Sequence, residues 1–177
     1  GCRVGVFKAD ITDLRQMEDT IVSIKRKFGP VRGLIHSAGV LNDALILNMD
    51  LQKFKSVLYP KMLGVLVADK VTENEPLDFM VLYSGLVSYV GIMGQSNHTA
   101  ANFFEDNYAF YRNNILSKRT LVINWGIWGA AGIVAKPYYK ESLKEQGFTP
   151  METDEALAAF DAVFCSGQVQ VGIWHIS

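Results

Sequence analysis

The sequence predicts an α/β fold, a doubly wound parallel sheet with helices on both faces, and two observations lead to it. Segments with apolar residues at alternate positions are interleaved with segments whose apolar residues recur every three to four positions, which is typical of strand–helix repeats. The run at 77–83 is largely apolar, as in a central strand buried on both faces. No repeat or linker divides the 177 residues, so we expect one structural unit.

The elements follow one another in the order that such a sheet requires. Residues 3–8 are predicted as the first strand. Asp13 is predicted to cap the helix that follows, because its carboxylate can accept from free backbone N–H groups, and Gly29-Pro30 is predicted to end it. Further strands are expected at 31–36, 77–83, 119–124 and 169–176, helices at 54–71, 97–112, 141–146 and 154–164, and a loop at 129–137.

One part of this fold is missing from the predicted elements. A doubly wound nucleotide-binding sheet begins with a strand, a glycine-rich turn and a helix whose N-terminus holds a pyrophosphate, and no such unit precedes residue 3. In the usual strand order 3-2-1-4-5-6, the strand at 3–8 takes the place of strand 3, which pairs only with strand 2. We therefore expect the C-terminal portion of such a domain, starting at its third strand and lacking the first two β-α units. The strand at 3–8 would have no neighbour in its own chain, and the missing N-terminal half would be removed or come from another polypeptide.

Composition excludes several classes of function. The 17 Lys and Arg residues are balanced by 18 Asp and Glu, a net charge of -1, so there is no basic surface for nucleic acid. The apolar runs are short and broken by Gly, Asn or Lys, so we expect no membrane span and no signal peptide. Cys2 and Cys165 stand in no metal-ligand spacing. We expect a cytoplasmic, reduced and metal-free protein.

Five motifs occur in order along the chain. They are Asp10-Ile11, His36-Ser37-Ala38-Gly39, Tyr59-Pro60-Lys61-Met62-Leu63-Gly64, Gly94-Gln95-Ser96-Asn97-His98-Thr99-Ala100-Ala101-Asn102 and Asn124-Trp125-Gly126-Ile127-Trp128. Together they resemble the ketoreductase domain of modular polyketide and animal-type fatty acid synthases, a relative of the short-chain dehydrogenases/reductases with a Rossmann-like fold. The resemblance implies NADPH-dependent reduction of a β-ketoacyl group on an acyl carrier protein, beside neighbouring megasynthase domains.

The resemblance also assigns catalytic positions, and two of them are altered here. In the family the fourth motif reads G-Q-x-N-Y-x-x-A-N, where the tyrosine protonates the new alkoxide, and His98 stands at that position. Thirteen residues upstream, Gly85 stands where the family has a serine that holds the substrate carbonyl. Lys61, which in the family lowers the pKa of the tyrosine, and Asn102, part of the same proton network, are retained.

Replacements for the two lost groups are few. Ser84 is adjacent to Gly85, but neighbours on an extended segment face opposite sides. Ser88 is three residues further on and would have to turn toward the site. His98 can donate a proton, yet the like charge of Lys61 disfavours its imidazolium. Losing a positioned acid costs about 10²–10⁴-fold and losing an oxyanion donor about 10²–10³-fold, so we expect little activity unless His98 and Ser88 take over.

The resemblance places a cofactor site along the strand ends. It implies adenine contacts from Asp10 with Ile11, ribose contacts from Ser37, Ala38, Gly39 and Lys61, and nicotinamide contacts from Trp125 with Gly126. The residues themselves leave plainer interpretations open, which are a turn aspartate at Asp10, a buried, hydrogen-bonded His36, a surface lysine at Lys61 and core aromatics at Trp125 and Trp128.

Three functions remain open at this point. The first is a working ketoreductase half with His98 as an unusual acid, which the retained Lys61, Asn102 and Asp10 favour. The second is a catalytically silent scaffold that packs neighbouring megasynthase domains, which Gly85 and His98 favour. The third is an unrelated short-chain dehydrogenase, and the P-K-x-x-G lysine argues against it. We adopt a ketoreductase-type domain with altered active-site residues.

Overall fold

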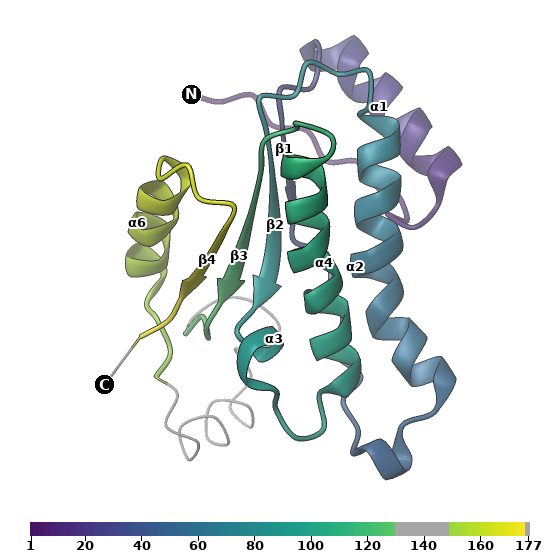
Figure 1. Ribbon diagram of the computed structural model, residues 1–177. Coiled ribbons are helices and arrows are strands. Elements are labelled where there is room, and N and C mark those ends of the chain that lie inside the picture. The colour runs from purple at the N-terminus through teal and green to yellow at the C-terminus, as the bar shows by residue number, and fades with distance from the viewer. Residues whose placement is uncertain (130–148, 176–177) are drawn as a thin grey trace.

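Four short apolar strands pair in parallel to form the sheet. The computed structural model describes residues 1–129 and 149–175, and Figure 1 shows their arrangement. The strands are β1 (Gly33–His36), β2 (Phe79–Gly85), β3 (Thr120–Trp125) and β4 (Gln170–Ile173), in the order β1-β2-β3-β4. Parallel neighbours need long crossover connections, and helices lie in them here. The predicted α/β fold with a parallel sheet is therefore confirmed.

Helices cover both faces of this sheet. α2 (Leu51–Val71) and α4 (Ser96–Asn114) pack on one face, and α6 (Thr153–Phe164) packs on the other (Figure 1). Because successive side chains of a strand point to opposite faces, β2 contributes Met80 and Leu82 to the core under α2 and α4, and Val81 to the core under α6. Every residue of β3 is buried, as expected for a central strand.

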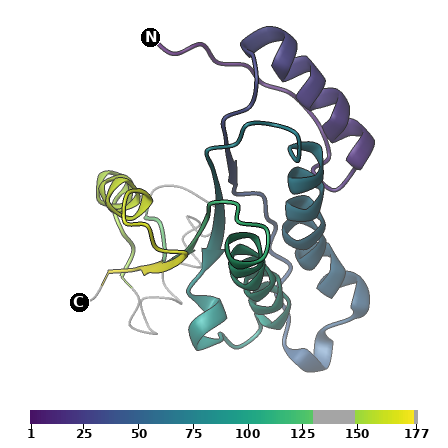
Figure 2. The ribbon, with the colours of Figure 1, turned by 45° about the horizontal axis from the view of Figure 1, so that its top comes forward.

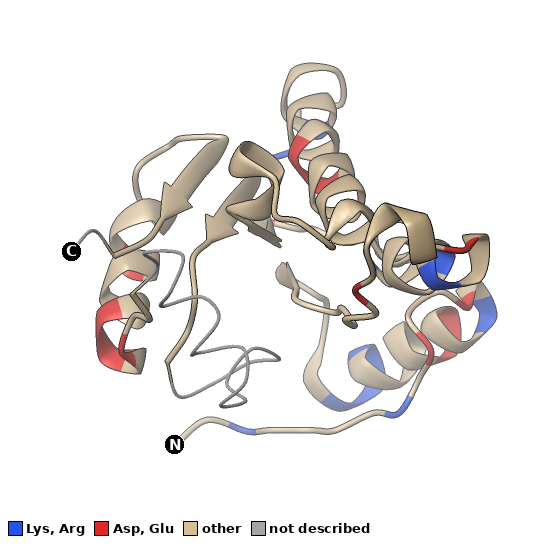
Figure 3. Ribbon diagram, turned by 90° about the horizontal axis from the view of Figure 1, so that it is seen from below, with Lys and Arg blue, Asp and Glu red and all other residues tan. Residues whose placement is uncertain are grey.

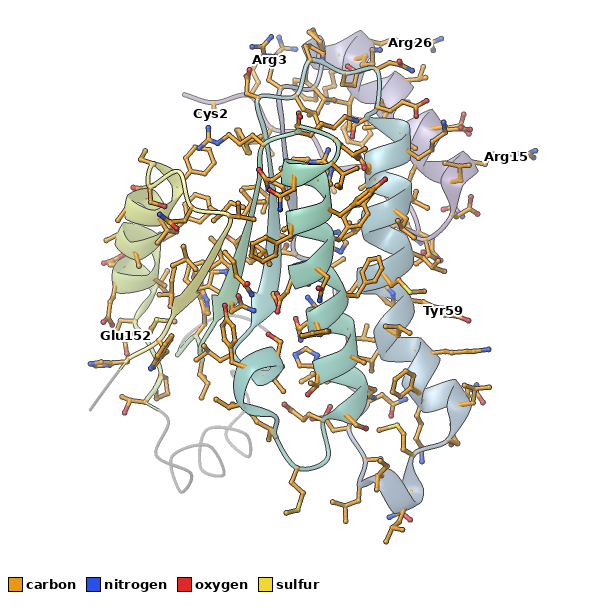
Figure 4. The ribbon with its side chains drawn as sticks, viewed as in Figure 1. Cys2, Arg3, Arg15, Arg26, Tyr59 and Glu152 are labelled. Atoms are coloured by element: carbon orange, nitrogen blue, oxygen red, sulfur yellow. The ribbon has the colours of Figure 1, made fainter. Side chains whose placement is uncertain are left out.

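The helix α1 (Leu14–Phe28) lies beside α2 (Figure 2) and has the predicted caps at both ends. Asp13 Oδ1 accepts from the backbone N of Gln16 at 3.0 Å. Gly29 ends the helix with φ 93°, a conformation that glycine adopts without steric cost. Arg15 and Arg26 project outward from this helix (Figure 4).

The segment before α1 differs from the prediction. Residues 1–10 form no strand, and Val6 is 94% exposed. A β-strand is held by hydrogen bonds to a neighbouring strand, and the described part of the chain provides none for this segment. The strand predicted at 3–8 is therefore wrong for this chain taken by itself.

Some boundaries also differ. β2 begins two residues later than predicted, because Asp78 belongs to the preceding turn, where its Oδ1 lies 2.7 Å from Arg32 Nη2 and its backbone N donates to Arg32 O. The same strand runs on to Gly85, two residues further than predicted. The helix expected at 141–146 and nearly all of the loop expected at 129–137 lie outside the described residues.

Charged side chains lie on helices and loops, and the four strands carry none (Figure 3). Over residues 1–129 and 149–175, no helix is long and apolar enough to cross a membrane. In the same ranges, no group of three or more His, Cys, Asp or Glu residues is arranged to hold a metal ion.

A buried polar cluster joins α4 to α2 and β3. Arg112 is 1% exposed, and it donates to Asp69 Oδ1 at 2.9 Å and to Thr120 Oγ1 at 2.6 Å. The Tyr108 hydroxyl donates to Asp69 Oδ2 at 2.6 Å. Removing one member of a buried ion pair leaves the other charge without a partner, which typically costs about 3–5 kcal/mol.

We therefore expect Arg112→Met, in the complete protein, to lower the free energy of unfolding by about 3–5 kcal/mol in urea denaturation. Arg32→Met is the matched control, because it breaks the exposed Arg32–Asp78 pair and should cost less than about 1 kcal/mol. Equal losses in the two variants would contradict the role given to the buried cluster.

Candidate active site

Three strand ends and two helices meet at one edge of the sheet. β1 ends at His36, β2 at Gly85 and β3 at Trp125, and the carboxyl ends of neighbouring parallel strands lie together. Ligands bind at this edge in open α/β sheets. α2 supplies Lys61 and the first turn of α4 supplies His98. Motifs that are far apart in the sequence are thus close together in the fold.

Lys61 is buried, and its interpretation as a surface lysine is wrong. Tyr59, two residues earlier on α2, points outward (Figure 4). Lys61 is only 5% exposed, and its Nζ donates to the backbone O of Tyr83 at 2.6 Å and to Glu105 Oε2 at 2.8 Å. These two acceptors hold the ammonium inside the protein. An ammonium has three N–H groups, so one remains for a further partner.

One face of α4 carries three polar residues toward the sheet. His98, Asn102 and Glu105 are spaced by four and three residues, which places them on one side of the helix. Asn102 Nδ2 donates to His98 O at 2.8 Å, and its Oδ1 is buried without a hydrogen-bond partner. Asn102 Nδ2 would also lie 3.7 Å from a Cβ added at Gly85. Asn102 therefore lies against both Gly85 and His98.

The two histidines of the site are neutral at pH 7. Burial, and secondly the charge of Lys61, lower the pKa of His98 to about 4, and the same two causes lower the pKa of His36 to about 4. His98 Nδ1 is buried without a hydrogen-bond partner. The predicted burial of His36 is confirmed, but neither of its ring nitrogens makes a hydrogen bond, and Nε2 lies 3.4 Å from Glu105 Oε1. The backbone of Pro60 also acts on this ring and partly opposes the fall in the pKa of His36.

Gly85 leaves room for a side chain at the end of β2. A Cβ there would be 3.6 Å from Val87 Cγ1, 3.7 Å from Asn102 Nδ2 and 3.8 Å from Trp125 O, all ordinary contacts. The space around Gly85 would therefore admit a Cβ atom without a clash.

The two nearby serines are held by hydrogen bonds to other groups. Ser84 is buried, and its Oγ donates to Asn102 O at 3.4 Å and accepts from Asn124 Nδ2 at 3.1 Å. Ser88 Oγ donates to Gly85 O at 3.0 Å and lies 2.9 Å from Asn124 Nδ2. Either hydroxyl would have to break these bonds to turn toward a ligand beside Gly85.

Asp10 and Ile11 lie on the side of the site nearest α1. Asp10 is exposed, and its Oδ1 accepts from the backbone N and the Oγ1 of Thr12 at 2.9 and 2.8 Å. These bonds, the backbone one first, lower the pKa of Asp10. The turn interpretation therefore describes its local structure. Ile11 packs on α2, where its Cγ2 would be 3.2 Å from a Cβ added at Gly64.

The remaining predicted contacts lie at the ends of β1 and β3. Ser37, Ala38 and Gly39 follow β1 directly, and a Cβ at Gly39 would be 3.6 Å from Lys61 Cε. Trp125 is 7% exposed and stacks edge-on with Trp128 at 5.0 Å between ring centroids. Trp125 is thus a core aromatic, whereas Gly126 donates its backbone N to Ile173 O at 2.7 Å.

Two polar residues of the site, Glu105 and Asp106, were missed in the sequence. Glu105 binds Lys61, and Asp106 Oδ1 accepts from Asn124 Nδ2 at 2.9 Å behind Gly85. The spacing of Glu105 from His98, two helical turns on one face, was the only signal that could have found it. Asp106 carries no pattern of its own, because it stands between two other polar residues, Glu105 and Asn107. Asn124 was noted only as part of the fifth motif, without a role.

An apolar groove of about 630 Å³ lies near the site, on the other side of α4. From α4 it is lined by Ser96, Thr99, Ala100 and Phe103, which face away from the side that carries His98. The other walls come from residues 44–47 and 91–94. The groove therefore does not contain the polar cluster around Lys61.

This chain is similar to a known protein family and to two polyketide synthases. Residues 1–130 match a family model described as the KR domain. The polyketide synthase PksN of Bacillus subtilis is 34% identical over 97% of this chain, which spans 3% of that protein, and the polyketide synthase ThaG of Burkholderia thailandensis is 30% identical over 98%, again 3% of that protein.

Two solved structures resemble the fold closely. A ketoreductase domain from the bacillaene assembly line is 34% identical with a TM-score of 0.85, over 94% of this chain and 41% of that one. A structure of A-type ketoreductases from a modular polyketide synthase is 26% identical with a TM-score of 0.93, over 99% of this chain and 37% of that one. The chain thus spans less than half of either structure.

Gly85→Ala should be tolerated or stabilising by up to about 1 kcal/mol, because the added methyl group meets only ordinary contacts and restricts the unfolded chain. Gly33→Ala, also in a strand, is the comparison, since its Cβ would overlap the Phe79 ring and overpacking costs about 1–3 kcal/mol. Thermal and urea unfolding measure both effects, and a destabilised Gly85→Ala would contradict the open space described here.

His98 should make stability depend on pH in a defined direction. Its pKa of about 4 in the folded protein lies below the ordinary 6.5, so the unfolded chain takes up the proton first as pH falls. Stability present above pH 6.5 is lost between pH 6.5 and 4, by up to about 2 kcal/mol at pH 5. In urea unfolding, His98→Gln should reduce this loss, whereas His175→Gln, at an exposed histidine, should not.

Proposed function

Because this chain belongs to the family of ketoreductase domains, we propose that it carries the reducing site of such a domain in a polyketide synthase. The substrate is the β-keto group of an acyl thioester on a carrier protein, and the product is the β-hydroxy thioester. The proposal is supported mainly by one observation: Lys61, Asn102, His98 and Gly85 meet at the carboxyl edge of the sheet.

The residues at this edge fit a reduced nicotinamide cofactor, NADPH in our proposal. When bound, the cofactor supplies the hydride that attacks the keto carbon. Gly39 keeps the space beside Lys61 Cε free of a side chain, and the third N–H of Lys61 would bind a ribose hydroxyl. Asp10 would accept from the adenine, with Ile11 beside it. Ser37, Ala38 and Gly126 let the backbone approach the ligand, next to Trp125.

Proton donation is the weak step of the proposed reaction. The alkoxide oxygen must receive a proton, and neutral His98 offers only an imidazole N–H, a poorer donor than a phenol or an imidazolium. Gly85 offers no hydroxyl to the developing oxyanion. Losses of about 10²–10⁴-fold for the acid and about 10²–10³-fold for the oxyanion donor predict slow turnover.

A second function is favoured by the same two residues. Neutral His98 and the glycine at position 85 suit a domain that keeps its fold and has lost its chemistry. Such a domain would act as a scaffold that packs against neighbouring domains of the megasynthase. Retention of Lys61 and Asn102 in a shared cluster argues for the reductase, since a scaffold does not need them.

The proposed domain includes a first half with two further β-α units. Ile35 on β1 is 50% exposed at the edge of the sheet, and residues 1–10 have no strand neighbour in the described part of the chain. Two strands inserted between this segment and β1 would pair with both. Unpaired strand edges favour such additions.

NADPH oxidation with a β-ketoacyl thioester surrogate tests the function on the complete domain. We expect slow turnover by the native protein and a gain of at least about 10²-fold in Gly85→Ser/His98→Tyr, which restores a hydroxyl and a phenol. Adding Lys61→Met to that double variant is the control and should abolish the gain.

The outcomes separate the two functions. Slow native turnover with rescue supports the reductase. No native turnover with rescue supports a silent scaffold on a fold that still binds the cofactor. Silence in both proteins, with NADPH binding also absent, would refute the reductase proposal.

A further inference from the structure

Glu105 lies at the centre of the polar cluster, yet the mechanism above does not use it. Its side chain is fully buried. Oε2 accepts from Lys61 Nζ at 2.8 Å, and Oε1 lies 3.4 Å from His36 Nε2 without a hydrogen bond. One carboxyl group of α4 therefore contacts side chains from α2 and from β1, next to the strand ends where the cofactor would bind.

The charged and titratable groups around Glu105 come from three elements. α2 contributes Lys61, β1 contributes His36, and α4 contributes Asp106. His98, two turns earlier on α4, is affected by the charge of Lys61. β2 presents only the backbone carbonyl of Tyr83, through Lys61. Burial raises the pKa of Glu105 to about 7, although Lys61 opposes the rise, and Asp106 adds to it. The carboxyl group therefore changes its charge near neutral pH.

We infer that Glu105 is a positioning residue that couples cofactor binding to the uptake of one proton. The inference rests on the proposed function, because it takes Lys61 as the group that meets the cofactor. Ionised Glu105 neutralises the ammonium of Lys61 and draws it into the protein. Protonated Glu105 leaves the full positive charge to an anionic dinucleotide. The proton comes from solvent, and no other bond forms or breaks.

Charge sets the direction and the size of this effect. A carboxylate 2.8 Å from the ammonium cancels much of its field, and charges in a buried site are less screened than in water. The negatively charged dinucleotide therefore favours protonated Glu105. If only this form binds, apparent affinity follows its population, which is about one tenth at pH 8 for a pKa of about 7. The affinity should then be about tenfold lower at pH 8 than for a permanently neutral side chain.

The test compares NADPH binding by the complete domain at pH 6 and pH 8, using fluorescence titration. Glu105→Gln keeps the shape of the side chain and removes its charge. It should bind about tenfold more tightly than the native protein at pH 8 and about equally at pH 6. Glu73→Gln is the matched control, because it removes the carboxylate of the exposed Lys70–Glu73 pair, and it should bind as the native protein does.

Calorimetry in buffers of different ionisation enthalpy measures the protons taken up on binding. At pH 8 the native protein should take up more protons than Glu105→Gln. The 2′-phosphate of NADPH titrates in the same range, but its contribution cancels between the two proteins. Equal uptake and equal pH dependence in the two proteins would overturn the inference and leave the proposed function intact.

NMR spectroscopy gives a third readout, which follows the protonation of Glu105 directly. The ¹³C resonance of the Glu105 carboxyl should titrate near pH 7 in the free domain. This resonance is assigned by its loss in Glu105→Gln. If that variant does not fold, its loss in Glu105→Asp gives the assignment. Saturation with NADPH should move this titration to higher pH. A titration that stays in place with NADPH bound would overturn the inference. Absence of NADPH binding at every pH would overturn the inference and the cofactor role of Lys61 together.

Discussion

The parallel register between β2 and β3 is the constraint on which the site depends. Met80 stands opposite Thr120 at one end and Gly85 opposite Trp125 at the other, so the two strands finish side by side. Because β3 is buried throughout, α4 packs along both strands, and its first turns reach their carboxyl ends. This register brings His98 and Asn102 to Gly85. A slip by one residue would turn every side chain of the strand to the other face.

α4 is unusual in turning its polar residues inward. Its buried residues include Asn97, Asn102, Glu105, Asp106 and Arg112, whereas Phe103 and Phe110 are 57% and 41% exposed. Glu105 pairs with Lys61 and Arg112 pairs with Asp69, both on α2, while Asp106 accepts a hydrogen bond from Asn124 on β3. Buried ion pairs seldom add stability over apolar residues of the same size. We interpret them as fixing how α4 is placed against α2.

The contacts around Lys61 determine the balance of charge at the candidate site. Lys61 is held by Glu105 and the Tyr83 carbonyl, and the nearby imidazoles of His98 and His36 are neutral. A buried cation paired with a carboxylate presents less net positive charge to a ligand than a cation that faces a neutral phenol. If the proposed function holds, this one set of contacts affects cofactor affinity, proton supply and fold stability together, so the proposed function and the role of Glu105 need separate tests.

The sequence alone determined what depends on neighbours along the chain. The alternation of strands and helices, the caps at Asp13 and Gly29, and the burial of His36 follow from local periodicity and backbone preference, and the ordered motifs led to the family. Only the tertiary structure decided the burial of Lys61 and its pairing with Glu105, 44 residues away. The tertiary structure also showed that residues 3–8 do not form a strand in this chain. Pairings across the fold depend on packing and on which strands are present, and no local pattern encodes them.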